Sequence, residues 1–189
     1  MKVTLCKYKK NFCNKSENYC CFTGLRPQKL NFKENSEKFN IIISKCEKCI
    51  IQLIERYNVT NFISGMALGW DIWCAEEILK LRDRYLNISL ECAIPCSKQD
   101  KYWSKSDKRR YTEILSKADN IIQLQEKYTS DCMIKRNQYM VDKCLYVLAL
   151  WDRQNGGTAN TIKYALEKER RIIIINPVTM KVLANKKIE

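Results

Sequence analysis

The alternation of short apolar runs with segments of helical hydrophobic period most constrains how this chain folds. Apolar runs lie at residues 19–22, 61–64, 88–94, 120–124, 145–150 and 171–175. Segments with apolar side chains at i, i+3 and i+4 lie between them, at 36–57, 71–85, 108–117, 131–143 and 158–169. Strands that alternate with helices form parallel sheets, because a parallel pair needs a long crossover connection. The sequence therefore predicts an α/β fold with a doubly wound, mostly parallel sheet flanked by helices.

The length of 189 residues fits one domain with a sizeable core. We expect residues 1–18 to form an N-terminal extension or an edge element, and residues 19–189 to form a single Rossmann-like domain. The apolar runs are shorter than the roughly 18 residues that span a bilayer. The lysine-rich start of the chain lacks the apolar stretch of a secretory signal. We therefore expect a cytoplasmic protein.

Eleven cysteines and the absence of histidine restrict the available chemistry. Without histidine, Ser-His-Asp and Cys-His catalysis and histidine-ligated metals are excluded. Most cysteines fall in predicted strands and helices, as small buried residues do in a reducing compartment. The alternatives are a disulfide framework, a zinc site at Cys6, Cys13 and Cys20, or a redox pair at Cys46 and Cys49. We expect no bound metal.

The five glycines of the chain all follow predicted strands. Gly24 follows the first strand, Gly65 and Gly69 follow the second, and Gly156 and Gly157 follow the strand at 145–150. The carboxyl ends of parallel strands meet at one edge of a sheet, and ligands bind in the crevice there. Glycine lets the backbone approach a ligand closely or adopt a positive φ. The sequence therefore predicts a ligand site at this edge.

The segment Gly156-Gly157-Thr158 opens a predicted helix directly after a strand. Free backbone N–H groups and the helix dipole suit such a position to phosphate. Thr158 either bonds a phosphate oxygen or only caps the helix. Asn160 follows in the first turn, and Asp152 precedes the glycines in the same loop. The segment is not a P-loop, because Gly-x-x-x-x-Gly-Lys is missing.

The segment from Ser64 to Gly69 also joins a predicted strand to a predicted helix. Gly65 and Gly69 bracket a tight turn that contains Met66, and Asp71 is placed to cap the helix. The Gly-x-x-x-Gly spacing alone is a weak signal. Its position at the predicted ligand edge makes the whole segment a candidate for ligand contact.

Trp70 and Glu76, which follow this turn, each have two interpretations. The indole of Trp70 either stacks on a base or packs in the core. Glu76 is either a solvated glutamate or an acceptor for a ribose hydroxyl. If the chain is an enzyme, Glu76 and Asp71 are its candidate catalytic residues, and otherwise we expect no catalytic residue.

The loop after the first strand contains a candidate phosphate ligand. Arg26 lies between Thr23-Gly24 and Pro27. The proline holds the arginine in an extended conformation. A guanidinium in this place pairs with phosphate as a fork.

Further candidates lie later in the chain. Arg136 and Asn137 are on the helix before the strand at 145–150, where Arg136 either contacts a ligand or is an exposed helix charge. Pro95 follows the third strand. Gln99 and Trp103 come next, in a polar segment that is a candidate lid.

The formal net charge of +13 has three explanations. A basic surface attracts nucleic acid or a small polyanion, and a coding bias toward lysine gives the same charge on a solvated surface. Nucleic-acid binding is not favoured, because the chain has no basic motif interleaved with aromatic residues.

These loops, in this order, resemble those of the SLOG superfamily, which includes the lonely-guy enzymes, DNA-processing protein A and the molybdenum-cofactor carrier protein. The similarity is strongest to the YpsA-like branch, found in bacteria and phages. It runs from about Cys20 to Pro177. The matching residues are Cys21-Phe22-Thr23-Gly24, Arg26-Pro27, Ser64-Gly65-Met66-Ala67-Leu68-Gly69 with Asp71, Ala75 and Glu76, Ala93-Ile94-Pro95-Cys96, Gln99, Trp103, Arg136-Asn137, Tyr139-Met140-Val141-Asp142, Trp151-Asp152 and Gly156-Gly157-Thr158-Ala159-Asn160.

The resemblance implies a Rossmann-like fold and a homodimer or higher homo-oligomer that binds nucleotides or nucleotide-derived signals. Two positions depart from the family pattern. Leu25 stands where the branch usually has histidine. No glutamate follows Gly156-Gly157 at the spacing of the lonely-guy catalytic glutamate. The chain thus lacks the group that hydrolyses an N-glycosidic bond by that route.

We therefore expect non-catalytic binding of a small nucleotide-derived ligand, such as an adenine nucleotide, ADP-ribose or a cyclic-nucleotide signal, with no separate cofactor. Arg26 and Arg136 would supply positive charge, and Asp71 and Asp152 would bond ribose or base. The protein would act as a sensor or a sequestering sponge in phage-defence signalling, in the cytoplasm of a bacterial host if it is phage-encoded. The alternatives are a nucleotide phosphoribohydrolase or NAD glycohydrolase that uses Glu76 or Asp71, and single-stranded nucleic-acid binding.

Overall fold

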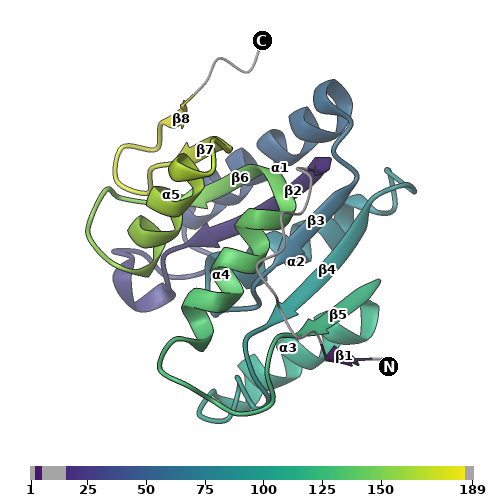
Figure 1. Cartoon of the computed structure of the whole chain (residues 1–189). Coiled ribbons are helices and arrows are strands. Elements are labelled where there is room, and N and C mark those ends of the chain that lie inside the picture. The colour runs from purple at the N-terminus through teal and green to yellow at the C-terminus, as the bar shows by residue number, and fades with distance from the viewer. Residues whose placement is uncertain (1–2, 6–15, 186–189) are drawn as a thin grey trace.

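One sheet of eight strands forms the centre of the computed structural model, which describes residues 3–5 and 16–185 (Figure 1). Neighbouring strands are parallel except for the last pair, β7 and β8, which is antiparallel. The predicted doubly wound, mostly parallel sheet is thus confirmed. Across the sheet the order is β1 (Val3–Leu5), β5 (Asn120–Gln123), β4 (Ser89–Ile94), β3 (Asn61–Ser64), β2 (Ser16–Gly24), β6 (Cys144–Leu150), β7 (Arg171–Ile175) and β8 (Val182–Ala184).

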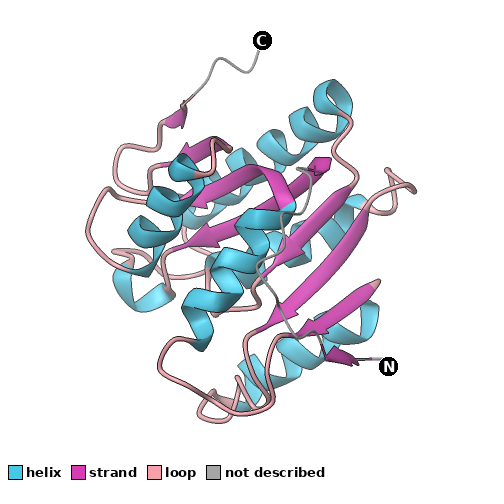
Figure 2. Ribbon diagram, viewed as in Figure 1, coloured by secondary structure: helices cyan, strands magenta, loops and turns pink. Residues whose placement is uncertain are grey.

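Helices cover both faces of this sheet (Figure 2). One face carries α1 (Glu37–Tyr57), α2 (Trp70–Leu81) and α3 (Lys105–Lys117). The other carries α4 (Cys132–Lys143) and α5 (Gly157–Glu167). A short 3-10 helix, η1 (Pro27–Lys29), follows β2. Each predicted helix and strand is present, with its ends shifted by a few residues.

The central strand β2 shows how the sheet is buried on both sides. Cys20 and Phe22 face the α1–α3 layer, and Cys21 between them faces the α4–α5 layer. All three side chains are fully buried. Because both faces of such a strand are covered by helices, successive residues are all buried, and its sequence is a continuous apolar run.

The order of the strands creates one switch point, at β2. From β2 the chain passes through β3 and β4 to β5, and α4 then crosses back to β6, on the other side of β2. The connections that leave β2 and β6 therefore run in opposite directions and open a crevice between them. Open α/β sheets bind ligands at this place.

The helices differ in whether a side chain caps the backbone N–H groups at their starts. Ser36 and Ser104 accept backbone N–H bonds at the starts of α1 and α3, at 3.3 and 3.1 Å. The starts of α2 and α5 instead have Gly69 and Gly156 as N-caps, with no side-chain cap bond. The start of α4, after Asp131, also has no side-chain cap bond, so α2, α4 and α5 leave first-turn N–H groups uncapped by side chains.

The cysteines between residues 16 and 185 are all free and buried, as expected for small core residues. Burial raises the pKa of the Cys49 thiol to about 12, so the pair with Cys46 is not a reactive thiolate site. Cys6 and Cys13 of the alternative zinc site lie outside the described residues. Among those described, no cluster of three or more cysteine or carboxylate residues could hold a metal ion.

The extension expected over residues 1–18 lies mostly outside the described residues. Within it, Val3–Leu5 runs parallel to β5 as an edge strand, and Ser16 already begins β2. No helix in the described part of the chain is long and apolar enough to cross a bilayer.

Trp70 joins α2 to the sheet. Its side chain is fully buried, and its indole Nε1 donates to the backbone carbonyl of Leu148 at 3.1 Å. A Cβ at Gly24 would lie 2.5 Å from the Cβ and Cγ of Trp70. The core-packing interpretation of Trp70 is therefore the one that the structure supports.

Replacing Trp70 should destabilise the fold strongly. We expect Trp70→Ala to lower the free energy of unfolding by about 3–5 kcal/mol, because it leaves a large cavity between α2 and the sheet. Urea denaturation followed by circular dichroism measures this change. Tyr102→Ala is the control, because Tyr102 is 87% exposed. Equal stability of the two variants would contradict the packing described here.

Candidate functional site

A cavity of about 190 Å³ opens at the carboxyl edge of the sheet, where β2 and β6 end. Its walls come from the β2 loop, the start of α2, one side of α4 and the loop that leads into α5. The crevice predicted from the glycine positions is therefore present as a cavity. Its lining residues are Thr23, Gly24, Leu25, Arg26, Lys29, Ala67, Asp71, Met133, Arg136, Asn137, Asp152, Gln154, Asn155, Gly156, Gly157 and Thr158.

The floor of the cavity is a buried ion pair. Arg136 Nη1 lies 3.6 Å from Asp71 Oδ2, and both side chains are more than nine-tenths buried. Burial raises the pKa of Asp71 and the Arg136 charge opposes this shift, while burial lowers the pKa of Arg136 and the Asp71 charge opposes that one. Each charge thus offsets part of the cost of burying the other.

The same guanidinium explains why residue 65 is a glycine. Arg136 Nη1 donates to the backbone carbonyl of Gly65. A Cβ at Gly65 would collide with this guanidinium and lie 2.7 Å from Asp71 Oδ2. Gly65 is therefore required for close approach of an arginine side chain, not of a ligand.

A line of hydrogen bonds continues from the ion pair to the start of α5. Arg136 Nε donates to Asn137 Oδ1 at 2.7 Å, and Asn137 Nδ2 donates to Thr161 Oγ1 at 2.8 Å. Thr161 Oγ1 in turn donates to the Gly157 carbonyl at 2.9 Å. These bonds through α4 therefore fix the position of the Gly65 turn relative to the loop that contains Gly156 and Gly157.

The start of α5 is the electropositive end of the cavity. No acidic residue lies in its first turn, and no side chain caps it. Lys29 Nζ lies 3.2 Å from the position that a Cβ of Gly156 would occupy, and a Cβ at Gly157 would meet no atom within 4 Å. Arg26 is exposed and also lines the cavity, where its charge acts on Asp71 and Arg136. An anion that enters here would meet backbone N–H groups and two cations.

Two carboxylates line the cavity. Asp71 belongs to the floor pair, and its Oδ2 also accepts from the Ala67 backbone N–H at 3.4 Å. Asp152 is half-buried, and its Oδ1 accepts from the Gln154 backbone N–H at 3.0 Å. Both side chains can therefore offer acceptor lone pairs to hydroxyl groups of a ligand.

Several predicted site residues support the cavity without lining it. Ser64 Oγ donates to the Asp71 carbonyl at 2.8 Å and accepts from the Met66 backbone N–H at 3.1 Å. A Cβ at Gly69, where φ is +89°, would lie 2.8 Å from Pro27 Cδ. These residues shape the turn under the cavity.

Four other candidates are placed elsewhere. Trp70 lies in the core, and Pro95 is buried outside the cavity wall. Asn160 lines a neighbouring groove. Glu76 Oε2 accepts from Arg110 Nη2 of α3 at 2.5 Å, so Glu76 faces α3 and is not brought to the cavity. The candidate lid residue Gln99 donates to the Met66 carbonyl at 2.7 Å, beneath the same turn.

Sequence analysis did not select several residues of the cavity wall. Lys29 gives no local signal in a chain with so many lysines, because only η1 brings it over the start of α5. Met133 was detectable, since it lies on the same helical face as Arg136 and Asn137. The others not selected as ligand contacts are Leu25, Ala67, Gln154 and Asn155.

Comparison with known proteins identifies the family. A family model described as the YspA SLOG family (YpsA) matches residues 20–183. The chain belongs to this family. It is 34% identical over 131 residues to the SPbeta prophage-derived protein YoqJ of Bacillus subtilis (strain 168). The aligned residues make up 61% of this chain and 75% of YoqJ. It is 28% identical over 151 residues to the UPF0398 protein YpsA of the same strain. The aligned residues make up 78% of this chain and 83% of YpsA.

Two solved structures share the fold. DNA processing protein A (DprA) from Streptococcus pneumoniae has a TM-score of 0.56 at 19% identity, covering 82% of this chain and 49% of that chain. DNA processing protein A from Helicobacter pylori, described with a single-stranded DNA binding mode, has a TM-score of 0.58 at 18% identity, covering 84% and 65%. The predicted membership of the SLOG superfamily and its Rossmann-like α/β fold are thus confirmed.

Alanine at two of the glycines should have opposite effects on stability. We expect Gly65→Ala to lower the free energy of unfolding by at least about 1–3 kcal/mol, because its methyl group displaces Arg136. Gly157→Ala adds a methyl group in open space at the start of α5, so we expect unchanged stability or a gain of about 0.4–1 kcal/mol. Thermal denaturation of both variants provides the comparison. A stable Gly65→Ala variant would contradict the packing of Arg136.

Removing the arginine of the ion pair should make stability depend on pH. In Arg136→Met the carboxyl of Asp71 is buried without its partner, so we expect a loss of about 3–5 kcal/mol at neutral pH. The folded-state pKa of Asp71 rises further above its unfolded value of about 3.9. The folded state then binds more protons than the unfolded state, so stability falls as pH rises above about 4.

Urea denaturation between about pH 4 and pH 8 measures this dependence. The control is Arg136→Met combined with Asp71→Asn, in which the slope introduced by Arg136→Met should disappear. If the single and double variants have the same pH dependence, Asp71 is not the group responsible.

Proposed function

We propose that the cavity binds a small nucleotide-derived ligand through its phosphate, and holds it without turning it over. The ligand class is an adenine nucleotide, ADP-ribose or a cyclic-nucleotide signal. The observation that carries this proposal is the uncapped start of α5 beside Lys29, in a cavity that Arg26 also lines, at the switch point of the sheet. Phosphate is the common group that makes best use of free N–H groups and two cations together.

The carboxylates of the cavity fit the sugar of such a ligand. Asp71 and Asp152 lie in the walls around the phosphate end, and carboxylates accept hydrogen bonds from ribose hydroxyls. Thr158, at the start of α5 and only 8% exposed, adds a hydroxyl next to the backbone N–H groups. Arg136 contributes through the pair with Asp71, which holds that carboxylate in place.

Three features favour holding over turnover. Asp71 is engaged by Arg136, and Glu76 is engaged by Arg110 on the side of α2 that faces α3. The start of α5 lacks the glutamate of the lonely-guy hydrolases. A prophage-derived relative at 34% identity supports a role as a sensor or sequestering sponge for a signal in phage defence. We also propose a homo-oligomer, following the family resemblance.

Loss of either cation at the start of α5 should weaken ligand binding. We expect Lys29→Ala and Arg26→Ala each to reduce the affinity for AMP or ADP-ribose by about ten-fold or more, because each removes a charge-assisted bond to phosphate. Isothermal titration calorimetry with a panel of AMP, ADP-ribose, NAD and cyclic adenylates measures the loss. The matched control is Lys33→Ala, an exposed lysine outside the cavity lining.

Two results would contradict this proposal. The first is the absence of heat with every compound of the panel, together with no nucleotide in the mass spectrum of small molecules released from the purified protein. The second is release of free base from NAD or a nucleotide, detected by chromatography and abolished by Asp71→Asn or Glu76→Gln, which would make the chain a hydrolase.

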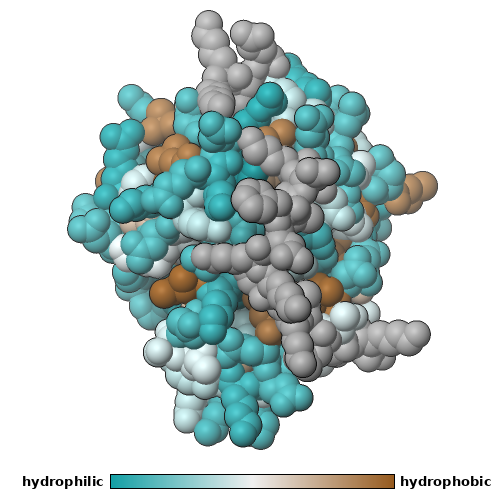
Figure 3. Space-filling model, viewed as in Figure 1, coloured by the Kyte–Doolittle hydropathy of each residue, from teal (hydrophilic) through white to brown (hydrophobic). Residues whose placement is uncertain are grey.

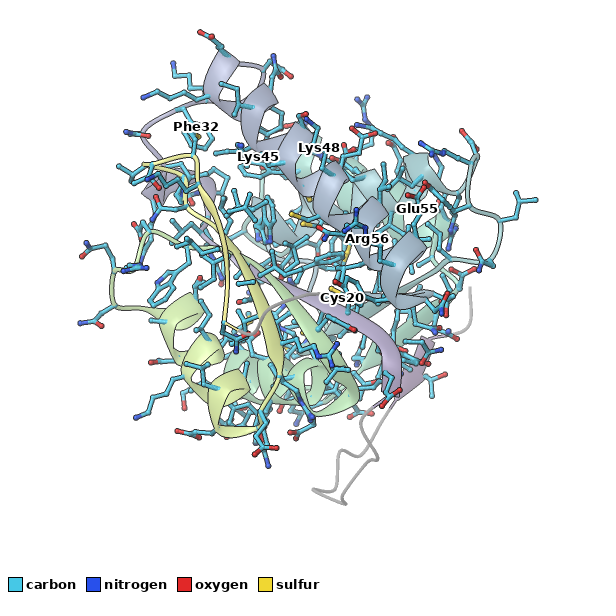
Figure 4. All side chains as sticks on the ribbon, turned by 90° about the horizontal axis from the view of Figure 1, so that it is seen from above. Cys20, Phe32, Lys45, Lys48, Glu55 and Arg56 are labelled. Carbon is cyan, nitrogen blue, oxygen red and sulfur yellow. The ribbon has the colours of Figure 1, made fainter. Side chains whose placement is uncertain are left out.

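A second candidate function is binding of single-stranded DNA. It is favoured by the fold shared with DNA processing protein A from Helicobacter pylori, whose structure is described with a single-stranded DNA binding mode, and by the net charge of +13. The charge is not gathered at the cavity alone. Lys45, Lys48 and Arg56 lie along α1, together with Glu55 (Figure 4), on the face of the sheet opposite α4.

Salt dependence separates a dedicated DNA site from general attraction. If lysine attraction alone is responsible, we expect the affinity for an oligonucleotide to fall steeply as salt rises, with the same slope for every sequence. Fluorescence anisotropy at several salt concentrations measures the slope. Affinity for an oligonucleotide that persists at about 200 mM salt and is lost in Arg26→Ala would instead favour the DNA function at this cavity.

A further inference from the structure

A second hollow, which we call the α4–α5 groove, lies next to the cavity. It has a volume of about 380 Å³ and runs between α4 and α5, which lie side by side over the same face of the sheet (Figure 1). The side chains of Met133, Ile134 and Tyr164 give its walls an apolar surface, and Gln138 and Asn160 add amide groups. Ile134 is 55% exposed, so this surface is accessible.

The groove and the cavity adjoin each other at the start of α5. Met133, Asn137 and Gly157 line both of them. Gly157 has no side chain at this junction, and a Cβ there would meet no atom within 4 Å. Asn137 lies on the α4 side of the junction and donates to Thr161 Oγ1 at 2.8 Å. The start of α5 therefore faces the cavity and the groove at once.

The two spaces together have the volume of a nucleotide site, and they differ in charge. Sites for small molecules measure about 300–1,000 Å³. The cavity, at about 190 Å³, is below this range and is charged at its α5 end. The groove adds about 380 Å³ of mainly apolar space. Phosphate and sugar fit the first space by charge, whereas a planar base fits the second by its apolar faces.

We propose that the α4–α5 groove holds the base of a nucleoside phosphate whose phosphate lies in the cavity, so that the ligand crosses Gly157. The inference rests on the proposed function and assigns its second subsite. The base lies against Ile134 and Met133, with its polar edge toward the amides of Gln138 and Asn160. Amide groups offer both a donor and an acceptor, which a base edge requires.

A second copy of this chain is the other conceivable occupant, and the surface favours the base. Where grey atoms do not cover the face in Figure 3, hydrophobic residues form small separate spots among hydrophilic ones. The core of a stable homodimer interface is more apolar than the rest of the surface. Lys163 and Glu167 also lie in the groove wall, which suits the polar rim of a small-molecule site.

AMP and ribose 5-phosphate test the inference directly, because they differ only by the base. We expect calorimetry to show AMP binding about ten-fold or more tighter than ribose 5-phosphate, because the base buries apolar surface against Ile134 and Met133. Ile134→Gln and Asn160→Ala should each weaken AMP binding toward the ribose 5-phosphate value and leave ribose 5-phosphate unchanged. The matched control is Leu166→Gln on α5, because Leu166 is 52% exposed and lies outside the groove lining; it should change neither.

Each remaining outcome overturns the inference in a different way. Equal affinity for AMP and ribose 5-phosphate places the base outside the groove, while the proposed phosphate site stands. Binding of neither compound overturns the inference, and the proposed function falls with it only if the rest of the panel, including ADP-ribose and NAD, also gives no heat. Light scattering identifies the third case: if Ile134→Gln converts a dimer to a monomer without changing AMP affinity, the groove is an interface between two copies.

Discussion

The buried ion pair of Arg136 and Asp71 is the interaction on which the rest of the site depends. Its charges lie in the interior, where an unpaired charge costs several kcal/mol. The pair therefore fixes α4 against the start of α2, and the bond to the Gly65 carbonyl adds the turn after β3. The topology meets this requirement by sending α4 back across the sheet from β5 to β6. A single arginine thus joins α4 to a turn and a helix start that lie far earlier in the chain.

This pairing also decides which charges remain for a ligand. Arg136 is largely neutralised by Asp71, so the free positive potential comes from Lys29, Arg26 and the uncapped start of α5. The hydrogen bonds through Asn137 carry the position of the pair to α5. A ligand therefore meets a charge distribution that is in place before it arrives, which lowers the cost of ordering groups on binding. The positive potential of the cavity thus comes from these local groups and not from the overall excess of lysine in the chain.

Most of the fold could be predicted from the sequence, because hydrophobic period and loop glycines are local signals. The helix over α1 was expected one residue from its observed start, since Ser36 is a local cap. An edge element was expected over residues 1–18, where β1 lies. The edge strand β8 was not expected, because a strand of three residues has no period of its own and exists only through its neighbour. Of the expected loop residues, Thr23, Gly24, Arg26, Asp152, Gly156, Gly157 and Thr158 line the cavity, whereas Trp70 and Glu76 had two interpretations each. Burial and a partner on α3 decided between them.

The sequence by itself determined the class of fold, the edge of the sheet at which the cavity opens and the absence of histidine chemistry. These follow from period, glycine placement and composition, which do not depend on contacts between distant residues. Only the tertiary structure decided that Gly65 receives an arginine, that Lys29 lies over the start of α5, and that Gly157 separates a charged cavity from an apolar groove. These are contacts between segments far apart in the chain, and their geometry is set by the packing of α4 and α5 on the sheet.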